Sequence, residues 1–86
     1  MPDPAGYGSH LSSESAAFLI ALPRRQQRLV LDLADQIATH PFQISDYQTT
    51  DADDRVIENL LLGAYLFTYW VDHGAREVRI TEIVKV

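Results

Sequence analysis

The last third of the chain alternates between apolar and polar residues around two tight turns, and this pattern predicts three antiparallel strands. The predicted strands cover residues 55–62, 65–72 and 77–86. Gly63 and Ala64 join the first two strands, and glycine at the first central position of a two-residue loop indicates a type II′ hairpin. A loop of this length fixes the register, because it places Leu62 opposite Tyr65 and every further pair follows from that one.

This register predicts that one face of the sheet is apolar and forms the core. The apolar side chains on this first face are Val56, Leu60, Leu62, Tyr65, Phe67, Tyr69, Val71, Val78, Ile80 and Val84. Burial of each large side chain contributes roughly 1.5–3 kcal/mol, so this face should pack against the rest of the chain. Glu58 and Glu82 fall on the same face. We interpret them as lying at the sheet margin or pairing with Arg24, Arg25 or Arg28, and the alternative is a pair of catalytic carboxylates.

The second face is mixed, with one charged end and one apolar end. Its charged end carries Arg55, Trp70, Asp72, Glu77 and Arg79. The register places Arg55 opposite Asp72, and it places Trp70 beside Arg79, within cation–π distance. The apolar end consists of Leu61, Leu66 and Ile83. We predict that a partner's strand or helix, or a second copy of the chain, covers this apolar end. The alternative is coverage by the chain's own N-terminal arm or by residues 42–54.

Two helices are predicted before the sheet. Ser12 or Ser13 can N-cap the first helix, and Pro23 ends it because proline disfavours helix at the preceding residue. The second helix runs from Pro23 to Thr39, where apolar residues recur at three- and four-residue spacing. The predicted fold class is therefore α+β, with an N-terminal helical hairpin packed on a C-terminal three-stranded antiparallel meander.

The same pattern predicts a loose N-terminal arm over residues 1–12 and a single domain over residues 13–86. Residues 1–10 contain two prolines, two glycines and no alternation, which indicates a loop, while an extra N-terminal edge strand stays open. Residues 42–54 read as a polar connection between the helices and the sheet. Such a connection is long for a compact domain, so part of it should be ordered or functional.

Composition narrows the functional classes. With 86 residues, of which 47 % are hydrophobic, the chain can bury one modest core and is not a disordered protein. Its formal net charge of −5 argues against non-specific binding to nucleic acid, which depends on clustered lysine and arginine. No apolar run is long enough to span a membrane, no secretory signal is visible and no cysteine is present. We therefore expect a cytoplasmic protein without disulfides.

The charges are unevenly distributed along the chain. Arg24, Arg25 and Arg28 lie together, whereas residues 32–58 carry seven acidic residues against the single Arg55. A dipolar surface of this kind favours a charged protein partner. The alternative is two solvated faces that bind nothing.

The residues that could carry chemistry do not form a recognisable catalytic or metal-binding motif. His10, His40 and His73 are about thirty residues apart, and no glycine-rich phosphate loop or nucleophile elbow is present. We therefore predict neither a metal nor an organic cofactor. Asp72 and His73 could form an acid–base pair, but their place at a hairpin before Gly74 favours a role in the turn.

The three predicted strands over residues 55–86 carry a resemblance to a known protein family. The aromatic and aliphatic spacing resembles the pattern G-x-Y-x-x-x-Y-x-V-D of the RelE/ParE superfamily of type II toxin–antitoxin toxins. The matching residues are Gly63, Tyr65, Tyr69, Val71, Asp72, Val78 and Ile80, with Leu22-Pro23 breaking and His40-Pro41 closing the helices. The resemblance covers about residues 13–86. It implies a compact α+β toxin in a bacterial gene pair, neutralised by an antitoxin segment laid along the sheet and the helical hairpin.

The chain departs from the mRNA-cleaving members at the positions where they carry basic residues. The corresponding positions here are Ile57, Asn59 and Leu66. Without those cations, little would stabilise the charge that develops on the phosphate during RNA cleavage. The sequence therefore argues against ribonuclease activity, whereas the gyrase-poisoning ParE branch does not need this set of residues.

Three hypotheses follow. The leading one is a toxin-like component that acts by binding a cognate antitoxin, or by self-association as a homodimer, and does not bind a membrane or free nucleic acid. The residues predicted to bind the partner are Leu61, Leu66, Trp70, Asp72, Arg79, Ile83, Arg24, Arg25 and Arg28. The second is a ribosome-dependent mRNA interferase with a relocated basic site made of Arg55, Arg79 and His73. The third is a small dimeric scaffold without toxicity.

Overall fold

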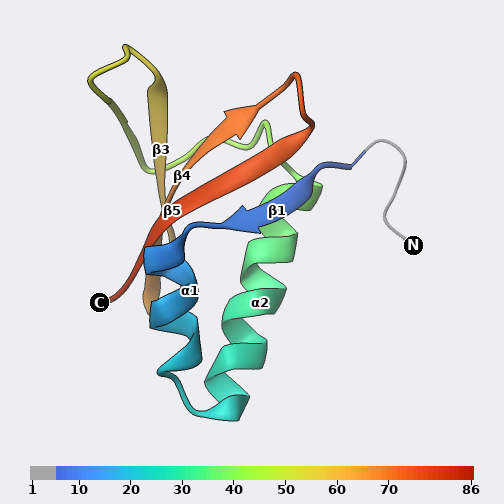
Figure 1. Ribbon diagram of the computed structural model, residues 1–86, viewed down its shortest axis with the longest axis vertical. Coiled ribbons are helices and arrows are strands. Elements are labelled where there is room, and N and C mark those ends of the chain that lie inside the picture. Colours follow the sequence, from blue (N-terminus) through green and yellow to red (C-terminus); the bar gives the residue numbers. More distant parts are fainter. Residues whose placement is uncertain (1–5) are drawn as a thin grey trace.

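The computed structural model describes residues 6–86 and shows two helices lying against one face of a five-stranded sheet (Figure 1). In chain order the elements are β1 (Gly8–Leu11), α1 (Ser13–Ile20), α2 (Arg24–Thr39), β2 (Tyr47–Thr50), β3 (Val56–Leu62), β4 (Tyr65–Asp72) and β5 (Glu77–Lys85). The strands are ordered β1-β5-β4-β3-β2, with β1 parallel to β5 and all other pairs antiparallel. The predicted α+β class and the helical hairpin are confirmed, and the predicted meander is the centre of a larger mixed sheet.

The core lies between α2 and the central strands. Its buried apolar residues are Val30, Ala34, Ile37, Ala38, Leu60, Tyr65, Phe67, Tyr69, Val78, Ile80 and Ile83. The residues from α2 recur at three- and four-residue spacing, as the sequence pattern predicted. Ser12 is the N-cap of α1, because its side-chain oxygen accepts a hydrogen bond from the backbone N–H of Ser15 at 3.1 Å. Pro23 directly precedes α2, which ends at Thr39 as predicted.

The N-terminal segment contributes a strand that the sequence pattern placed in a loop. Residues 8–11 pair in parallel with β5, and the backbone N–H of Ser12 continues the contact by donating to the carbonyl of Ile80 at 2.9 Å. Only Leu11 among the four strand residues is partly buried, so no apolar alternation marks the strand. The interpretation of residues 1–10 as a loop is therefore wrong from Gly8 onward, and the alternative of an extra N-terminal edge strand is confirmed. Residues 1–5 lie outside the described part.

A second edge strand lies within the predicted polar connection. Residues 47–50 form β2 and pair antiparallel with β3, with Tyr47 opposite Asn59. All four side chains are exposed, which explains why the sequence carries no strand pattern there. The carboxylate of Asp46 accepts a hydrogen bond from the backbone N–H of Leu61 at 2.6 Å and fixes the start of this pairing. The expectation that part of the connection is ordered is confirmed.

The hairpin between β3 and β4 has the predicted register. Its ladder runs from Leu62 opposite Tyr65 to Glu58 opposite Tyr69. Gly63 has a φ of +60°, whereas Ala64 is not among the residues with positive φ. Positive φ at the first central position alone is the backbone signature of a type II′ turn, so the predicted turn type is confirmed.

Replacement of Gly63 by alanine should destabilise the fold by about 1 kcal/mol, because a side chain at positive φ is strained. The matched control is Gly74→Ala in the next turn. Gly74 is not among the glycines with positive φ, and an added Cβ would meet Asp72 Oδ1 at an ordinary 3.5 Å. Urea denaturation of the two variants measures the difference, and equal stability would contradict the type II′ assignment.

The pairing of β4 with β5 departs from the predicted register after its first four pairs. Tyr69 lies opposite Ile80 as predicted, but Thr68 lies opposite Glu82, so the ladder shifts between them. Thr81 is the extra residue of a β-bulge, and a bulge reverses which side chains of the following segment face the core. The continued register predicted the pairs Tyr65–Val84, Leu66–Ile83 and Phe67–Glu82, and each of these is therefore wrong by one residue. The observed pairs are Tyr65–Lys85, Leu66–Val84 and Phe67–Ile83.

Because of the bulge, the side chains at positions 82, 83 and 84 lie on the opposite face of the sheet from the predicted one. Ile83 is only 3 % exposed and belongs to the core, whereas Val84 moves to the second face. Glu82 is exposed and lies across from Thr68, so it does not share the core face with Glu58. The hypothesis of paired catalytic carboxylates is therefore wrong.

The N-terminus of α1 fixes the bulge in place. Ser12 Oγ donates to the carbonyl of Thr81 at 2.9 Å, and the fully buried Ser15 Oγ lies 3.0 Å from the carbonyl of Ile80. A bulge interrupts the ladder and leaves backbone groups without strand partners. The helix cap supplies partners for these groups, so the helical hairpin determines the register of β5.

Candidate functional site

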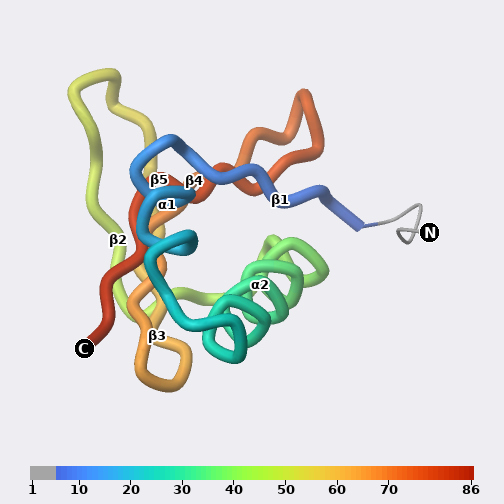
Figure 2. Tube along the Cα trace, turned by 60° about the horizontal axis from the view of Figure 1, so that its bottom comes forward, coloured from blue at the N-terminus to red at the C-terminus, as the bar shows by residue number. Residues whose placement is uncertain are grey.

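The helices cover one face of the sheet (Figure 2). The other face, which we call the open face, carries five of the predicted partner-binding residues, namely Leu61, Leu66, Trp70, Asp72 and Arg79. Leu61, Leu66 and Val84 form a row across β3, β4 and β5 on this face, which we call the apolar strip. Leu61 is 48 % exposed and Val84 is 41 % exposed, so neither residues 6–12 nor the 42–54 segment covers them. Val84 takes the place that the sequence pattern assigned to Ile83.

An arginine–tryptophan cluster occupies the opposite end of the open face. The guanidinium carbon of Arg55 lies 4.1 Å from the centre of the Trp70 ring, and that of Arg79 lies 5.6 Å from it. Both distances are within the range of cation–π interactions. The predicted contact of Trp70 with Arg79 is present, and Arg55 joins it as a second cation that the register alone did not place there.

The ion pairs at this end differ from the predicted ones. Arg55 does not pair with Asp72; its guanidinium lies 3.3 Å from Asp51 and 3.3 Å from Asp53, both in the turn between β2 and β3. Asp72 instead lies 3.4 Å from Arg79. The reason is the unpredicted strand β2, whose turn brings two additional carboxylates to the start of β3.

Carboxylates outnumber cations in this cluster. Arg79 also pairs with Glu77 at 3.1 Å, so two guanidinium groups face four carboxylates. The local charge of the cluster is therefore net negative. A phosphate group would have to displace these carboxylates before it could bind either arginine, whereas a protein partner can bind such a surface through complementary charges.

Asp51 organises the turn beside this cluster. The hydrogen bond from the backbone N–H of Arg55 to its carboxylate, at 3.0 Å, is the main reason that the pKa of Asp51 lies below its ordinary value of 3.8. The N–H of Asp53 donates to the same oxygen at 2.9 Å. The ionised carboxylate is thus the form that the folded protein stabilises.

Acidification should therefore remove the stability that the ionised Asp51 carboxylate contributes to the fold. A carboxyl group whose pKa is lowered by folding stabilises the fold above its unfolded pKa and ceases to do so as the pH falls through its folded pKa. We expect Asp51→Asn to lower the melting temperature at pH 7 and to reduce the difference in melting temperature between pH 7 and pH 3. Asp32→Asn, on the exposed side of α2, is the control and should show the wild-type difference. A wild-type difference in Asp51→Asn would contradict the stabilising role of the ionised Asp51 carboxylate.

A buried amide separates the charged end from the apolar strip. Asn59 is 5 % exposed; its Oδ1 accepts from Thr68 Oγ1 at 3.0 Å, and its Nδ2 donates to the Tyr47 carbonyl at 3.4 Å. The mRNA-cleaving relatives of the resemblance carry a basic residue at this position. In this chain it holds β2, β3 and β4 together, a role that depends on the unpredicted strand β2.

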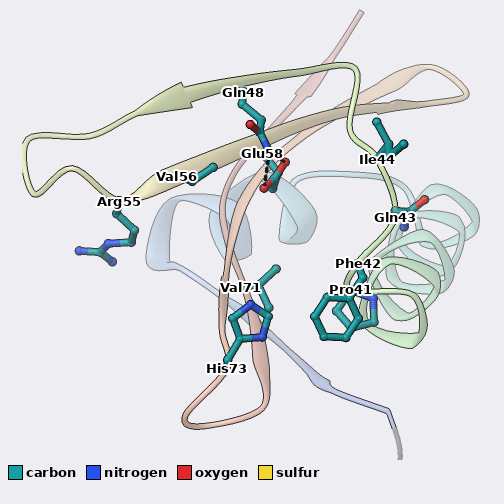
Figure 3. A pocket seen from close by; sticks show the side chains of 10 residues that line it. All are labelled: Pro41, Phe42, Gln43, Ile44, Gln48, Arg55, Val56, Glu58, Val71 and His73. Atoms are coloured by element: carbon teal, nitrogen blue, oxygen red, sulfur yellow. Dashed lines mark hydrogen bonds between the residues drawn. The ribbon is translucent and has the colours of Figure 1, made fainter.

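His73 lies away from Arg79 and from Trp70. Its Nδ1 is 3.0 Å from Tyr7 Oη, and its ring stacks on Phe42 with centroids 5.3 Å apart. His73 and Arg55 line the same cleft on the helix side, but the Arg55 guanidinium points away from it (Figure 3). The three residues of the relocated basic site are therefore not gathered around one point.

The three arginines of α2 form a separate surface. Arg24, Arg25 and Arg28 are exposed and line a shallow groove with Asp32 and Asp35. None of the three arginines belongs to an ion pair among residues 6–86. The predicted partner-binding residues thus lie on two different surfaces, one on α2 and one on the open face, except for Ile83, which is buried in the core.

The described part of the chain shows no other site of recognised chemistry. Within residues 6–86, no group of three or more histidine or acidic residues is arranged to hold a metal ion. Neither helix in this range is long and apolar enough to cross a membrane.

Comparison with known proteins identifies the fold. No protein-family model matches the chain, and no curated protein matches it in sequence. Its structure is similar to a chain of the toxin–antitoxin complex RelBE2 from Mycobacterium tuberculosis, with a TM-score of 0.78 and 17 % identity over 95 % of this chain and 100 % of that one. It is also similar to a chain of the archaeal RelE–RelB complex from Pyrococcus horikoshii OT3, with a TM-score of 0.70 and 18 % identity over 93 % and 94 % of the two chains.

The resemblance to the RelE/ParE superfamily is therefore confirmed at the level of the fold. The chain has a RelE-like fold, with two helices on a mixed sheet. The match covers nearly the whole of both chains.

Proposed function

We propose that this chain is a toxin-like component of a bacterial type II toxin–antitoxin system that acts in the cytoplasm by binding proteins. An antitoxin segment laid across the open face neutralises it. The fold supports this proposal, because one of the two similar structures is a toxin–antitoxin complex, RelBE2, and the other is a RelE–RelB complex.

The observation that carries the proposal is the apolar strip beside a charge-compensated cluster. Leu61, Leu66 and Val84 leave apolar surface in water on a face that no helix or strand of residues 6–86 covers. An exposed apolar row flanked by charged groups is typical of a protein-binding surface. RNA cleavage would need cations free to meet a phosphate, and Arg55 and Arg79 are each held by two carboxylates.

The proposal is tested by expressing the full chain with and without the product of the short reading frame adjacent to its gene. We expect the two proteins to co-purify as a stable complex, and we expect growth inhibition by the chain alone to be relieved by the second protein. Primer extension on translating ribosomes should show no new mRNA ends. New ends in the wild type that disappear in Arg79→Ala would support an mRNA interferase instead, and failure to form the complex would refute antitoxin binding.

A further inference from the structure

A second recessed surface lies on the helix side of the sheet, away from the apolar strip. The segment that follows α2 bends away from the sheet and leaves a cleft between itself, β3 and the end of β4 (Figure 3). Its volume is about 480 Å³, within the range of sites that hold a small ligand or a few side chains. Because Glu58 projects into its middle, we call it the Glu58 cleft.

The carboxylate of Glu58 has no cationic partner. Its Oε1 accepts from Ser45 Oγ at 2.8 Å and from Gln48 Nε2 at 3.0 Å, and its Oε2 accepts from the same amide at 3.1 Å. Both donors are neutral, and no ion pair to Glu58 exists among residues 6–86, so the expected pairing with Arg24, Arg25 or Arg28 is wrong. A carboxylate offers about four acceptor sites, so Oε2 retains capacity for a further donor.

A buried, unsatisfied hydroxyl belongs to the residue opposite Glu58. Tyr69 lies opposite Glu58 in the ladder and is fully buried, and its Oη has no hydrogen-bond partner among residues 6–86. Burial, together with the negative charge of Glu58, raises the pKa of Tyr69 to about 12. This hydroxyl stays protonated at neutral pH and cannot neutralise the carboxylate.

The rim of the cleft is apolar and exposed. Phe42 is 73 % exposed and Ile44 is 93 % exposed, and Val56 adds a third exposed apolar side chain on the opposite side. Arg55 is the nearest cation of the lining, but its guanidinium points outward and pairs with Asp51 and Asp53. The cleft therefore combines an unpaired negative charge at its centre with an apolar rim, in a protein of net charge −5.

We propose that the Glu58 cleft binds a segment of a partner protein in which an arginine side chain stands next to an apolar side chain. The guanidinium would donate to Glu58 Oε2, and the apolar neighbour would pack on Phe42, Ile44 and Val56. This site is separate from the apolar strip, so it does not depend on antitoxin binding at the open face. A partner that used both surfaces would have to wrap around the β2 edge of the sheet.

The test titrates the full-length ¹⁵N-labelled protein with N-acetyl-leucyl-arginine amide and records amide shifts by NMR. The matched probe is N-acetyl-leucyl-citrulline amide, which keeps the shape of arginine without its charge. We expect saturable shifts confined to residues 41–48, 55–58 and 71–73, and about fivefold weaker binding of the citrulline peptide, the size of one partly exposed ion pair. Glu58→Gln should remove this preference for arginine.

Two further variants separate binding from folding. Glu82→Gln removes an exposed carboxylate from the other face and should bind as the wild type does, whereas Ile44→Ala changes a solvent-exposed rim residue and should weaken both peptides. Equal binding of the two peptides, an unchanged preference in Glu58→Gln, or shifts centred elsewhere would overturn the proposal. Concentration-dependent shifts of the same residues without peptide would overturn it in favour of a second copy of this chain. Because no antitoxin is present, these results are independent of the test of the proposed function.

Discussion

Ile83→Asp should abolish folding under conditions in which Val84→Asp leaves the protein folded. Ile83 lies opposite Phe67 in the core, so the substitution removes a buried aliphatic side chain and places a carboxylate among apolar neighbours. The lost burial costs about 2–5 kcal/mol and the buried, unpartnered polar group costs roughly 2–7 kcal/mol more. Together they are comparable with the whole stability of a domain of this size, roughly 5–10 kcal/mol. Val84 stands on the open face, where a carboxylate remains hydrated, and its replacement should cost about 1 kcal/mol.

Far-UV circular dichroism and urea denaturation of the purified variants measure this difference. The neighbouring pair is its own control, because both residues are β-branched and differ by one position in the same strand. A regular β5 without the bulge would predict the reverse, with Val84→Asp unfolded and Ile83→Asp folded. That reversed result would show that the bulge at Thr81 is absent in solution.

The register of β5 beyond the bulge could not be predicted from the local sequence. Alternation and the Gly63 turn predicted the β3–β4 pairs from Glu58–Tyr69 to Leu62–Tyr65, since a two-residue loop leaves no freedom in register. An extra residue in β5 has no such local signature. Its position depends on Ser12 and Ser15, more than sixty residues earlier, whose hydroxyl groups contact the carbonyls that the bulge exposes.

The local sequence pattern marks neither of the two edge strands, for a related reason. Strand β2 has no buried side chain, and β1 has only the partly buried Leu11, so neither carries the alternation of a half-buried strand. Their pairing comes from backbone hydrogen bonds and from isolated anchors such as the Asp46 carboxylate. These contacts follow from the tertiary arrangement rather than from the local sequence.

The candidate site was predictable in part. Leu61 and Leu66 were assigned to an exposed apolar row by the register of a single hairpin, and the contact of Trp70 with Arg79 followed from the next one. The position of the Arg55 guanidinium could not be predicted, because its partners Asp51 and Asp53 lie in the turn that β2 creates. The Glu58 cleft also depends on the path of residues 41–48, for which the sequence offers only polar composition.

Leu66→Asp should weaken antitoxin binding at least about 30-fold, corresponding to about 2 kcal/mol. Leu66 is the central residue of the apolar strip, between Leu61 and Val84, so a bound segment that covers the strip must desolvate its side chain. A carboxylate at that position would be buried in the complex without a cation, because the arginines of this face are paired at its other end. Isothermal titration calorimetry with the purified antitoxin measures the change.

The matched control for Leu66→Asp is Ile20→Asp, which introduces the same charge at a residue that is 74 % exposed on α1. Its dissociation constant for the antitoxin should be within about threefold of the wild-type value, because a surface substitution outside an interface changes stability and affinity little. Both variants should show the wild-type circular dichroism spectrum, since neither residue belongs to the core. If Leu66→Asp binds as tightly as Ile20→Asp, the antitoxin does not use the apolar strip. If Ile20→Asp alone is defective, the bound segment lies on the helical hairpin, and the arginines of α2 become the cations that recognise it.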